Sequence, residues 1–279
     1  MRTVEAGLIG DAVRRLFISS NIYLPDDVRQ AVKAARGCET WELARGVLGT
    51  IEENSETAGA LGIPICQDTG MACVFLDIGA QVSIAGDMAA AVNDGVAAAC
   101  REGYLRASIV SDPLRRNNTG DNTPAVLYID IVPGDSVTVT VAPKGFGSEN
   151  MSRLKMLKPA EGEQGVLDFV IETVEIAGGS PCPPIVVGVG IGGNFDRAAL
   201  LSKRALLSPL GKAHPDPYYA ELEQSLLEKI NALGIGPMGF GGGTTALGVS
   251  ILTAPTHIAG LPVAVNINCH VTRHATEVI

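Results

Sequence analysis

The sequence has few aromatic side chains and no long apolar run. Aromatic residues make up 4% of its 279 residues, with a single tryptophan. No uninterrupted apolar stretch approaches the roughly 20 residues that span a bilayer, so we expect no membrane partner. The first residues, Met1–Glu5, lack the basic, apolar and small-residue order of a signal peptide. We therefore expect a cytoplasmic protein.

Positive charge is also scarce. The chain has 21 basic and 30 acidic residues, which gives a formal net charge of −9 and a pI near 5.0. Such acidity argues against nucleic acid and against an anionic membrane surface as partners. An anionic substrate would have to be captured by a few local cations.

Internal repeats, low-complexity tracts and linkers are absent from the sequence. A hydrophobic content of 46%, a charged content of 18% and a mean hydropathy of +0.25 are typical of a globular protein. A chain of 279 residues is long enough for one large domain or two ordinary ones. We predict a single domain over residues 1–279.

Apolar periodicity predicts an α/β fold in which mixed small sheets are flanked by helices. Helical spacing fills most of the first 65 residues, giving a helical N-terminal segment, and returns at 87–102, 165–177, 196–207 and 218–233. Strands are predicted at 72–78, 126–132, 136–141, 185–189, 247–252 and 263–267. Because only Pro133-Gly134-Asp135 separates the second strand from the third, these two are predicted to pair as a hairpin.

Two glycine-bearing segments could meet an anion. Gly188–Gly193 lies between a predicted strand and a predicted helix, but its spacing does not fit the dinucleotide-binding pattern cleanly. Tight packing of the strand against the helix, or a generic anion-binding helix start, is the favoured interpretation. The predicted loop Lys144–Asn150 could offer backbone N–H groups to a carboxylate, or could simply be a hairpin exit.

Six cysteines are present. In a reducing compartment such a set is more often metal-binding or catalytic than a disulfide framework. Free cysteine is also a common small core residue, and we assign Cys38, Cys73 and Cys100 to that class. Cys73 lies in an apolar run typical of a buried strand, and Cys100 lies in an alanine-rich helical stretch.

The remaining cysteines, Cys66, Cys182 and Cys269, each lie at the edge of an apolar run. In sequence, 116 residues separate the first from the second and 87 separate the second from the third. Electron-transfer clusters use four cysteines that are mostly closely spaced. Three converging thiolates would instead hold an iron–sulfur cluster with one iron open to a substrate. Any one of the six cysteines, taken alone, is more often a structural residue than a ligand.

Polar neighbours of these cysteines suggest acid–base chemistry. Asp68 and Gln67 directly follow Cys66, where a carboxylate could exchange a proton and an amide could hold a substrate. Asp68 could equally cap the turn before Thr-Gly. His257, twelve residues before Cys269, is a general-acid or substrate-binding candidate or a structural histidine. Arg106 is a carboxylate clamp if it turns inward and a surface residue otherwise.

A series of motifs, in order from about residue 40 onward, resembles the iron–sulfur-dependent (class I) fumarate hydratases. The motifs lie at 64–70 (PICQDTG), 103–108 (GYLRAS), 118–124 (NTGDNTP), 144–152 (KGFGSENMS), 182–184 (CPP), 234–237 (GIGP) and 257–266 (HIAGLPVAVN). The resemblance is to the alpha subunit of the two-subunit form. One departure is Phe146, which stands where this family often has a third glycine.

The resemblance implies a [4Fe–4S] cluster whose open iron binds substrate, with Cys66, Cys182 and Cys269 as its ligands. By position, Asp68 and His257 match the family's acid–base residues. The positions that match its substrate-binding residues are Gln67, Arg106 and Gly147. These roles come from the resemblance and not from spacing.

The implied reaction is the reversible hydration of fumarate to L-malate by a hydro-lyase. In this family a second domain completes the active site, so the resemblance implies a separate beta subunit and a hetero-oligomer. The alpha subunit of L(+)-tartrate dehydratase shares the cysteine framework and is the nearest alternative. A non-catalytic protein with a structural zinc site, or with an anion-binding glycine loop, is an alternative of a different class.

Overall fold

The computed structural model describes residues 2–279, and their contacts divide the chain into two compact units. Unit 1 comprises the residues up to Pro25, Asn54–Phe146 and Arg273–Ile279. Unit 2 comprises Asp26–Glu53 and Gly147–Thr272. Each unit has its own sheet and its own apolar core. Whether residues 1–279 act as one catalytic domain stays a prediction.

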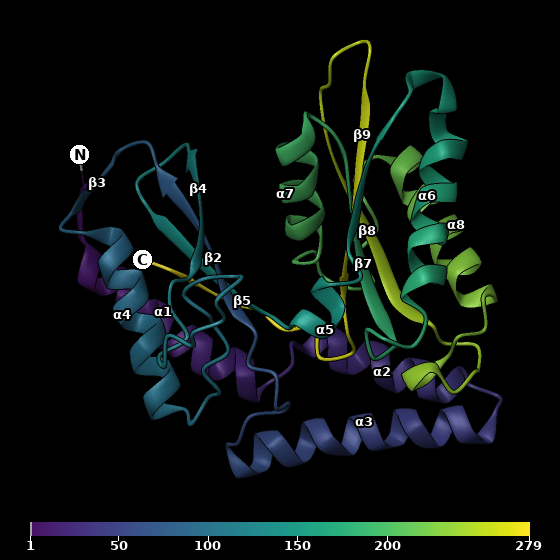
Figure 1. Cartoon of the computed structure of the whole chain (residues 1–279), viewed down its shortest axis with the longest axis horizontal. Helices are drawn as coiled ribbons and strands as arrows, with labels where there is room; N and C mark the ends of the chain where they lie inside the picture. Colours follow the sequence, from purple (N-terminus) through teal and green to yellow (C-terminus); the bar gives the residue numbers. More distant parts are fainter. Residues whose placement is uncertain (1) are drawn as a thin grey trace. The chain divides into compact units, whose positions relative to one another are not determined.

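Unit 1 is built on a four-stranded sheet with the order β10-β5-β2-β4. Its strands are β2 (Met71–Gly79), β4 (Val126–Val132), β5 (Val137–Lys144) and β10 (Ala275–Val278). The helices are α1 (Ala6–Ile22) and α4 (Met88–Glu102), and a short parallel pair is formed by β1 (Arg2–Glu5) and β3 (Val82–Ala85). The two helices pack against one another and against the sheet, and the apolar core lies between them (Figure 1).

The predicted hairpin between 126–132 and 136–141 is wrong, although both strands exist. β2 lies between them, parallel to β4 and antiparallel to β5. Residues 72–76 of β2 are all buried, while β5 alternates between buried and partly buried positions. A strand that is apolar on both faces belongs in the middle of a sheet. That burial advantage outweighs the short connection between β4 and β5.

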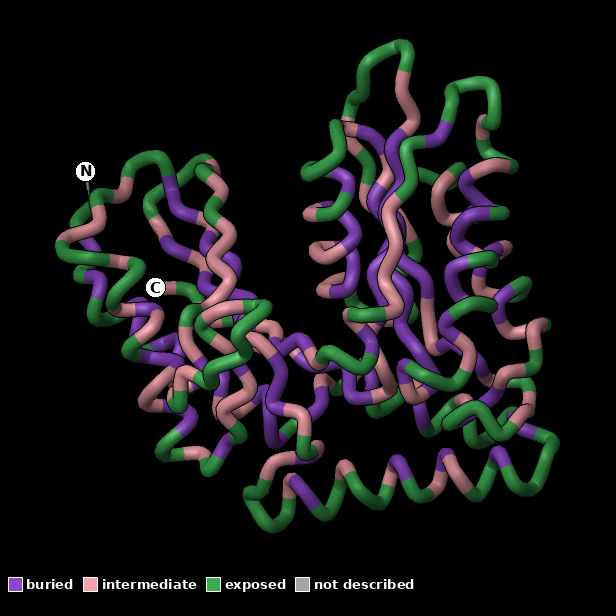
Figure 2. Tube along the Cα trace, in the orientation of Figure 1, coloured by how far each residue is buried: buried purple, intermediate pink, exposed green. Residues whose placement is uncertain are grey.

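Unit 2 contains a second four-stranded sheet, with the order β6-β9-β7-β8. Its strands are β6 (Arg153–Leu157), β7 (Ile185–Gly192), β8 (Ala246–Ala254) and β9 (Leu261–Asn268). Helix α7 (Phe195–Ala205) covers one face, and α6 (Gly162–Ala177) and α8 (Pro217–Ala232) cover the other (Figure 1). The two central strands, β7 and β9, are buried along most of their length (Figure 2).

The other helices of residues 2–279 are α2, α3 and α5. Helix α2 (Asp26–Cys38) belongs to unit 2, and α3 (Glu42–Leu61) begins in unit 2 and ends in unit 1. The short helix α5 (Phe146–Glu149) occupies part of the segment that we predicted to be a loop. Single 3-10 turns occur at Pro159–Glu161 and Pro237–Gly239.

The glycines of β7 bring helix α7 close to the sheet. A Cβ atom at Gly188 would lie 2.2 Å from the carbonyl oxygen of Ser202, and one at Gly190 would lie 2.1 Å from that of Ala198. The favoured interpretation of this segment, tight packing of strand against helix, is therefore confirmed. The strand predicted at 185–189 is longer than expected, because β7 continues to Gly192.

The predicted α/β class, with small mixed sheets and a helical N-terminal segment, is confirmed. The strands that the sequence analysis did not predict are short: β1, β3, β6 and β10. Among residues 2–279, no helix combines the length and the apolar character needed to cross a bilayer.

Candidate functional site

Cys66 begins a tight turn in unit 1. Its Sγ atom accepts a hydrogen bond from the backbone N–H of Asp68 at 3.4 Å and lies 3.4 Å from Oε1 of Gln67. The side chain is partly exposed and is not in a disulfide, in contrast to the buried Cys73 and Cys100. The thiol therefore lies at the surface of the unit, where a ligand can reach it.

Asp68 is held at both carboxylate oxygens. Oδ1 accepts the backbone N–H of Gly70 at 3.0 Å, and Oδ2 accepts the backbone N–H of Phe146 at 3.0 Å. The turn-capping role that we considered is thus present. The second bond joins the Cys66 turn to the start of α5, so the carboxylate has a fixed position.

Arg106 follows a segment that is tied to the same turn. Its backbone N–H donates to Oγ1 of Thr69 at 2.9 Å. The fully buried Asn122 donates from Nδ2 to the carbonyl of Gly70 at 3.0 Å and accepts the N–H of Ser108 at 2.8 Å. Unit 1 therefore brings the segments of Gln67, Asp68 and Arg106 together.

A buried cation that sequence reasoning missed supports this turn. The Arg273 side chain is 4% exposed, and its guanidinium donates to the carbonyls of Asp68 and Thr69. Burying an arginine is costly unless its N–H groups find acceptors. Arginine is usually a surface residue, and the only signal in the sequence was its place four residues after Cys269.

Cys182 and Cys269 lie at one end of the sheet of unit 2. Val186 near the start of β7 pairs with Asn268 at the end of β9, so Cys182 precedes one strand where Cys269 follows its neighbour. Both cysteines are partly exposed and neither is in a disulfide. Cys182 has a left-handed backbone, with φ of 54°, which is unusual for a residue other than glycine.

His270 contacts Cys182 at this end of the sheet. Both its Nδ1 atom, at 2.9 Å, and its backbone N–H, at 3.3 Å, lie within hydrogen-bond distance of the Cys182 carbonyl oxygen. Because a carbonyl only accepts, Nδ1 carries the proton. Burial lowers the pKa of His270, and the bond to Cys182 opposes this shift. The imidazole is therefore neutral near pH 7.

Gly147 lies near the same end of unit 2, within α5. Glu149 of this helix accepts a hydrogen bond from Nδ2 of Asn266 at 2.8 Å, and Asn266 is on the last part of β9. Lys203 of α7 also pairs with Glu149 at 2.7 Å. No atom other than those of its chain neighbours would lie within 4 Å of a Cβ at Gly147, so its surroundings are open.

His257 is at the opposite end of that sheet. It lies in the 255–260 connection, which leaves the end of β8 and enters the start of β9. β9 then runs eight residues before Cys269. At about 3.3 Å per residue, the ends of such a strand are roughly 23 Å apart. Unit 2 therefore does not bring His257 and its two cysteines together.

Among residues 2–279, no three His, Cys, Asp or Glu side chains form a group that could hold a metal ion. The predicted site residues are divided between the two units. Gln67, Asp68 and Arg106 accompany Cys66 in unit 1. In unit 2, Gly147 accompanies the pair formed by Cys182 and Cys269, and His257 stands apart.

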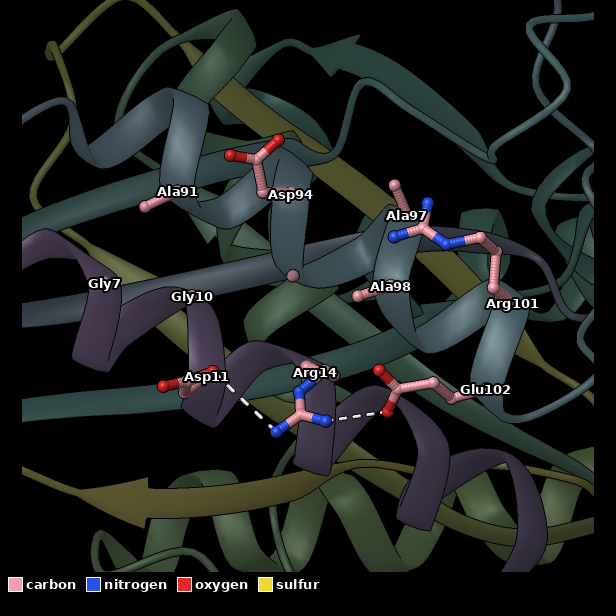
Figure 3. Close-up of a pocket in the computed structure, with 11 residues that line it drawn as sticks. Gly7, Gly10, Asp11, Arg14, Ala91, Asp94, Ala97, Ala98, Arg101 and Glu102 are labelled. Carbon is pink, nitrogen blue, oxygen red and sulfur yellow. Dashed lines mark hydrogen bonds and ion pairs between the residues drawn. The ribbon is translucent and has the colours of Figure 1, made fainter.

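A separate groove of about 500 Å³ lies between α1 and α4 of unit 1 (Figure 3). Its charged lining includes Arg14, which pairs with Glu102 at 2.7 Å and lies 3.8 Å from Asp11. None of the predicted site residues lines this groove. Asp94 and Arg101 are the other charged residues of its lining.

Comparison with known proteins decides the family. Residues 10–278 match the model of the fumarate hydratase (Fumerase) family. The chain belongs to this family. The Fumerase family resemblance that we inferred from the motifs is therefore confirmed, and the chain is a member of a hydro-lyase family.

The chain is also similar to proteins named as alpha subunits of L(+)-tartrate dehydratase. A protein of Methanocaldococcus jannaschii, provisionally named L(+)-tartrate dehydratase subunit alpha, is 45% identical over 275 residues, which is 96% of each chain. The L(+)-tartrate dehydratase subunit alpha of Escherichia coli O157:H7 is 36% identical over 260 residues, covering 92% of this chain and 86% of the relative. The subunit of the same name from E. coli K12 is 35% identical over an equal length.

Proposed function

We propose that this chain is the alpha subunit of an iron–sulfur-dependent fumarate hydratase, which hydrates fumarate reversibly to L-malate. The observation that carries the proposal is the placement of Cys182 and Cys269 beside the same end of the sheet of unit 2, although the cysteines are 87 residues apart in sequence. Cys66, with Gln67 and Asp68 beside it, supplies the third ligand. Residues 1–279 then act as one catalytic domain made of two units.

The chemistry of the three donors supports a [4Fe–4S] cluster. Cys66, Cys182 and Cys269 are partly exposed and outside disulfides, and thiolates are the protein ligands that such clusters require. Three of them would hold three irons and would leave the fourth open to a substrate. The bound cluster supplies a Lewis acid that polarises a substrate hydroxyl and carboxylate.

The course of the chain supports a meeting of the three cysteines. The chain passes between the units at residues 146–147 and at residues 272–273. At the first passage Phe146 bonds to Asp68, and at the second Arg273 bonds to the carbonyls of Asp68 and Thr69. Arg273 follows Cys269 by only four residues. The covalent chain thus limits how far the Cys66 turn can lie from Cys269.

The chain's own residues bind the substrate and move a proton. Arg106 supplies a fixed positive charge for a substrate carboxylate, and Gln67 supplies an amide for hydrogen bonding. The Asp68 carboxylate, held by two backbone N–H groups, exchanges a proton with the departing oxygen. His257 is the second acid–base residue by the family resemblance alone, since its sheet places it at the end opposite Cys182 and Cys269. A separate beta subunit provides the base at C3 and further cations.

The partner follows from the names of the relatives. Those relatives are named as alpha subunits, and this chain covers 96% and 86% of their lengths. We therefore expect a hetero-oligomer in which the isolated chain binds a cluster and is inactive. Addition of the beta subunit restores turnover.

A second candidate activity is the dehydration of L(+)-tartrate. The observation that favours it is the name shared by relatives at 35–45% identity. Tartrate carries one hydroxyl more than malate, so a site with a further hydrogen-bond partner for that group would prefer it. The two activities share the cluster and the roles of Asp68 and Arg106.

The experiment is anaerobic co-purification of the chain with its beta subunit, followed by assays on malate, fumarate and tartrate side by side. The proposal predicts four irons and four labile sulfides per chain and a larger kcat/KM for malate and fumarate. Preference for tartrate would select the second candidate. A colourless protein with bound zinc and no labile sulfide would overturn the cluster and favour a structural metal site.

A further inference from the structure

Unit 2 exposes three large apolar side chains at the cysteine end of its sheet. Trp41 is 47% exposed, Phe240 is 58% exposed and Met238 is 39% exposed. Trp41 lies between α2 and α3, and the other two lie in the 236–245 connection that enters β8. Because β7 and β8 are parallel, this connection enters β8 at the end where Cys182 precedes β7. The three side chains are called the Trp41 surface below.

The Trp41 surface directly adjoins the Cys182 segment. The backbone N–H of Met238 donates to the carbonyl of Pro183 at 2.7 Å, and Pro183 directly follows Cys182. A Cβ atom at Gly179 would lie 3.2 Å from the Cα atom of Gly239, so the two segments are also in close backbone contact. A polypeptide that covers the Trp41 surface would therefore lie beside Cys182.

A buried carboxylate holds the two parts of the surface together. Glu39 is 6% exposed. Its Oε1 atom accepts the backbone N–H groups of Thr40 at 3.0 Å and of Trp41 at 3.1 Å, and its Oε2 atom accepts that of Gly243 at 2.9 Å. Burying a carboxylate is costly unless it accepts such hydrogen bonds. Because the donors come from both segments, the turn between α2 and α3 is fixed to the 236–245 connection.

The exposed side chains are also fixed individually. The ring of Trp41 lies against Gly241, where a Cβ atom would be 2.2 Å from Cζ3 of the ring. Met238 has a left-handed backbone, with φ of 54°, which is unusual for a residue other than glycine. Such a conformation persists only where its surroundings enforce it. Apolar side chains that are already ordered lose little freedom on binding, which favours association.

The chemistry of the surface excludes a charged occupant. No Asp, Glu, Lys or Arg occurs between Ile230 and Thr272, in a chain whose net charge is −9. Trp, Phe and Met are enriched in protein–protein interfaces, and charged residues are depleted at the centre of such interfaces. Exposed apolar side chains that lie together mark a contact with another protein. The occupant is therefore an apolar surface of another polypeptide.

The proposed function supplies that polypeptide. The relatives are named as alpha subunits, and this chain covers 96% and 86% of their lengths, so the expected beta subunit is a separate chain. A beta subunit that completes the site has to lie beside the cysteines. We propose that Trp41, Met238 and Phe240 are the docking surface for the beta subunit. The inference rests on the proposed function, which provides the beta subunit and its place at the site.

Trp41 itself gives a direct test. It is the chain's single tryptophan, so alpha chains labelled with fluorotryptophan give one fluorine NMR resonance. Addition of unlabelled beta subunit is expected to shift this resonance and to abolish its response to exchange of H2O for D2O, because the ring leaves the solvent. An unchanged resonance, in a complex whose formation gel filtration shows, would overturn the inference. The same change on concentrating the alpha chain alone would also overturn it, because a second copy would then be the occupant.

A pair of variants tests the surface without a label. Phe240→Asp places a charge on a side chain that is 58% exposed and thus outside the core. We expect it to raise the Kd for the beta subunit about tenfold or more, measured by titration calorimetry. Phe195→Asp is the matched control, at a 65% exposed phenylalanine beyond the opposite end of β7, and binds as the wild type does. Equal Kd values for all three proteins, or equal weakening by both substitutions, would contradict the docking surface.

Failure of the contact and failure of the proposed function have different signatures. A complex that forms through the Trp41 surface but acts on neither malate, fumarate nor tartrate would be a failure of the proposed function alone. Hydro-lyase activity in a complex that leaves Trp41 in solvent would overturn the docking surface and leave the function standing. Absence of any association between the two chains would overturn the inference.

Discussion

The carbonyl oxygen of Cys182 lies within hydrogen-bond distance of two groups of one residue, Nδ1 of His270 at 2.9 Å and its backbone N–H at 3.3 Å. His270 directly follows Cys269. The two bonds therefore fix the positions of two cysteines relative to one another before any cluster is bound. Pre-positioned ligands of this kind lower the cost of ordering a metal site.

Replacement of His270 tests this positioning role. His270→Leu removes the Nδ1 donor, which is worth about 1 kcal/mol, and loosens the Cys182 segment. His270→Asn keeps an N–H donor on a shorter side chain. We expect the Leu variant to lose iron to a chelator faster than the wild type, with the Asn variant between them. Equal rates of iron release for all three proteins, measured at equal thermal stability, would contradict the role.

Asp68→Asn tests the proposed acid–base residue. The variant amide cannot accept both N–H groups that the carboxylate now accepts from Gly70 and Phe146. We expect kcat to fall about 100-fold or more, with a modest loss of stability. The control is Asp87→Asn, because Asp87 also accepts a backbone N–H, that of Ala90, at the start of α4. Steady-state assays and thermal unfolding of both variants separate the catalytic effect from the loss of a capping bond.

Gly10→Ala and Gly95→Ala test the helix crossing in unit 1. A Cβ at Gly10 would lie 2.4 Å from the carbonyl oxygen of Ala91, and one at Gly95 would lie 2.3 Å from that of Gly10. Overpacking of this kind typically costs about 1–3 kcal/mol, so both variants should unfold at lower denaturant concentration. Gly7→Ala, on the same helix with no neighbour within 4 Å, is expected to be neutral or slightly stabilising.

The reactivity of Cys100 should depend on pH in a defined direction. Burial raises the pKa of the Cys100 thiol from 9.0 to about 11, because removal from water disfavours the charged thiolate relative to the neutral thiol. The stability that this shift contributes is present below about pH 9 and is lost as pH rises through about 11. At pH 8 we expect iodoacetamide to label the exposed Cys38 and to spare Cys100. Mass spectrometry of labelled peptides checks this, and equal labelling at pH 8 would contradict it.

Near Cys66, some neighbours are evident from the sequence and others only from the folded chain. Gln67 and Asp68 are neighbours of Cys66 in the chain, so their proximity needs no fold. The contribution of Arg273 could not be inferred, because an arginine 205 residues from Asp68 shows its burial only when the chain has folded. Asn122 joins two segments in the same way. Its motif was visible in the sequence, but its contacts were not.

The sequence by itself determined most of the long helices and strands, which cysteines stand at the edges of apolar runs, and to which family the chain belongs. Local periodicity reports how a segment is buried, and that information is carried by neighbouring residues. Only the tertiary structure decided that β2 separates β4 from β5 and that β7 separates β8 from β9. Strand pairing depends on contacts between residues far apart in sequence. The same pairing places His257 and Cys269, only twelve residues apart in sequence, at opposite ends of one sheet.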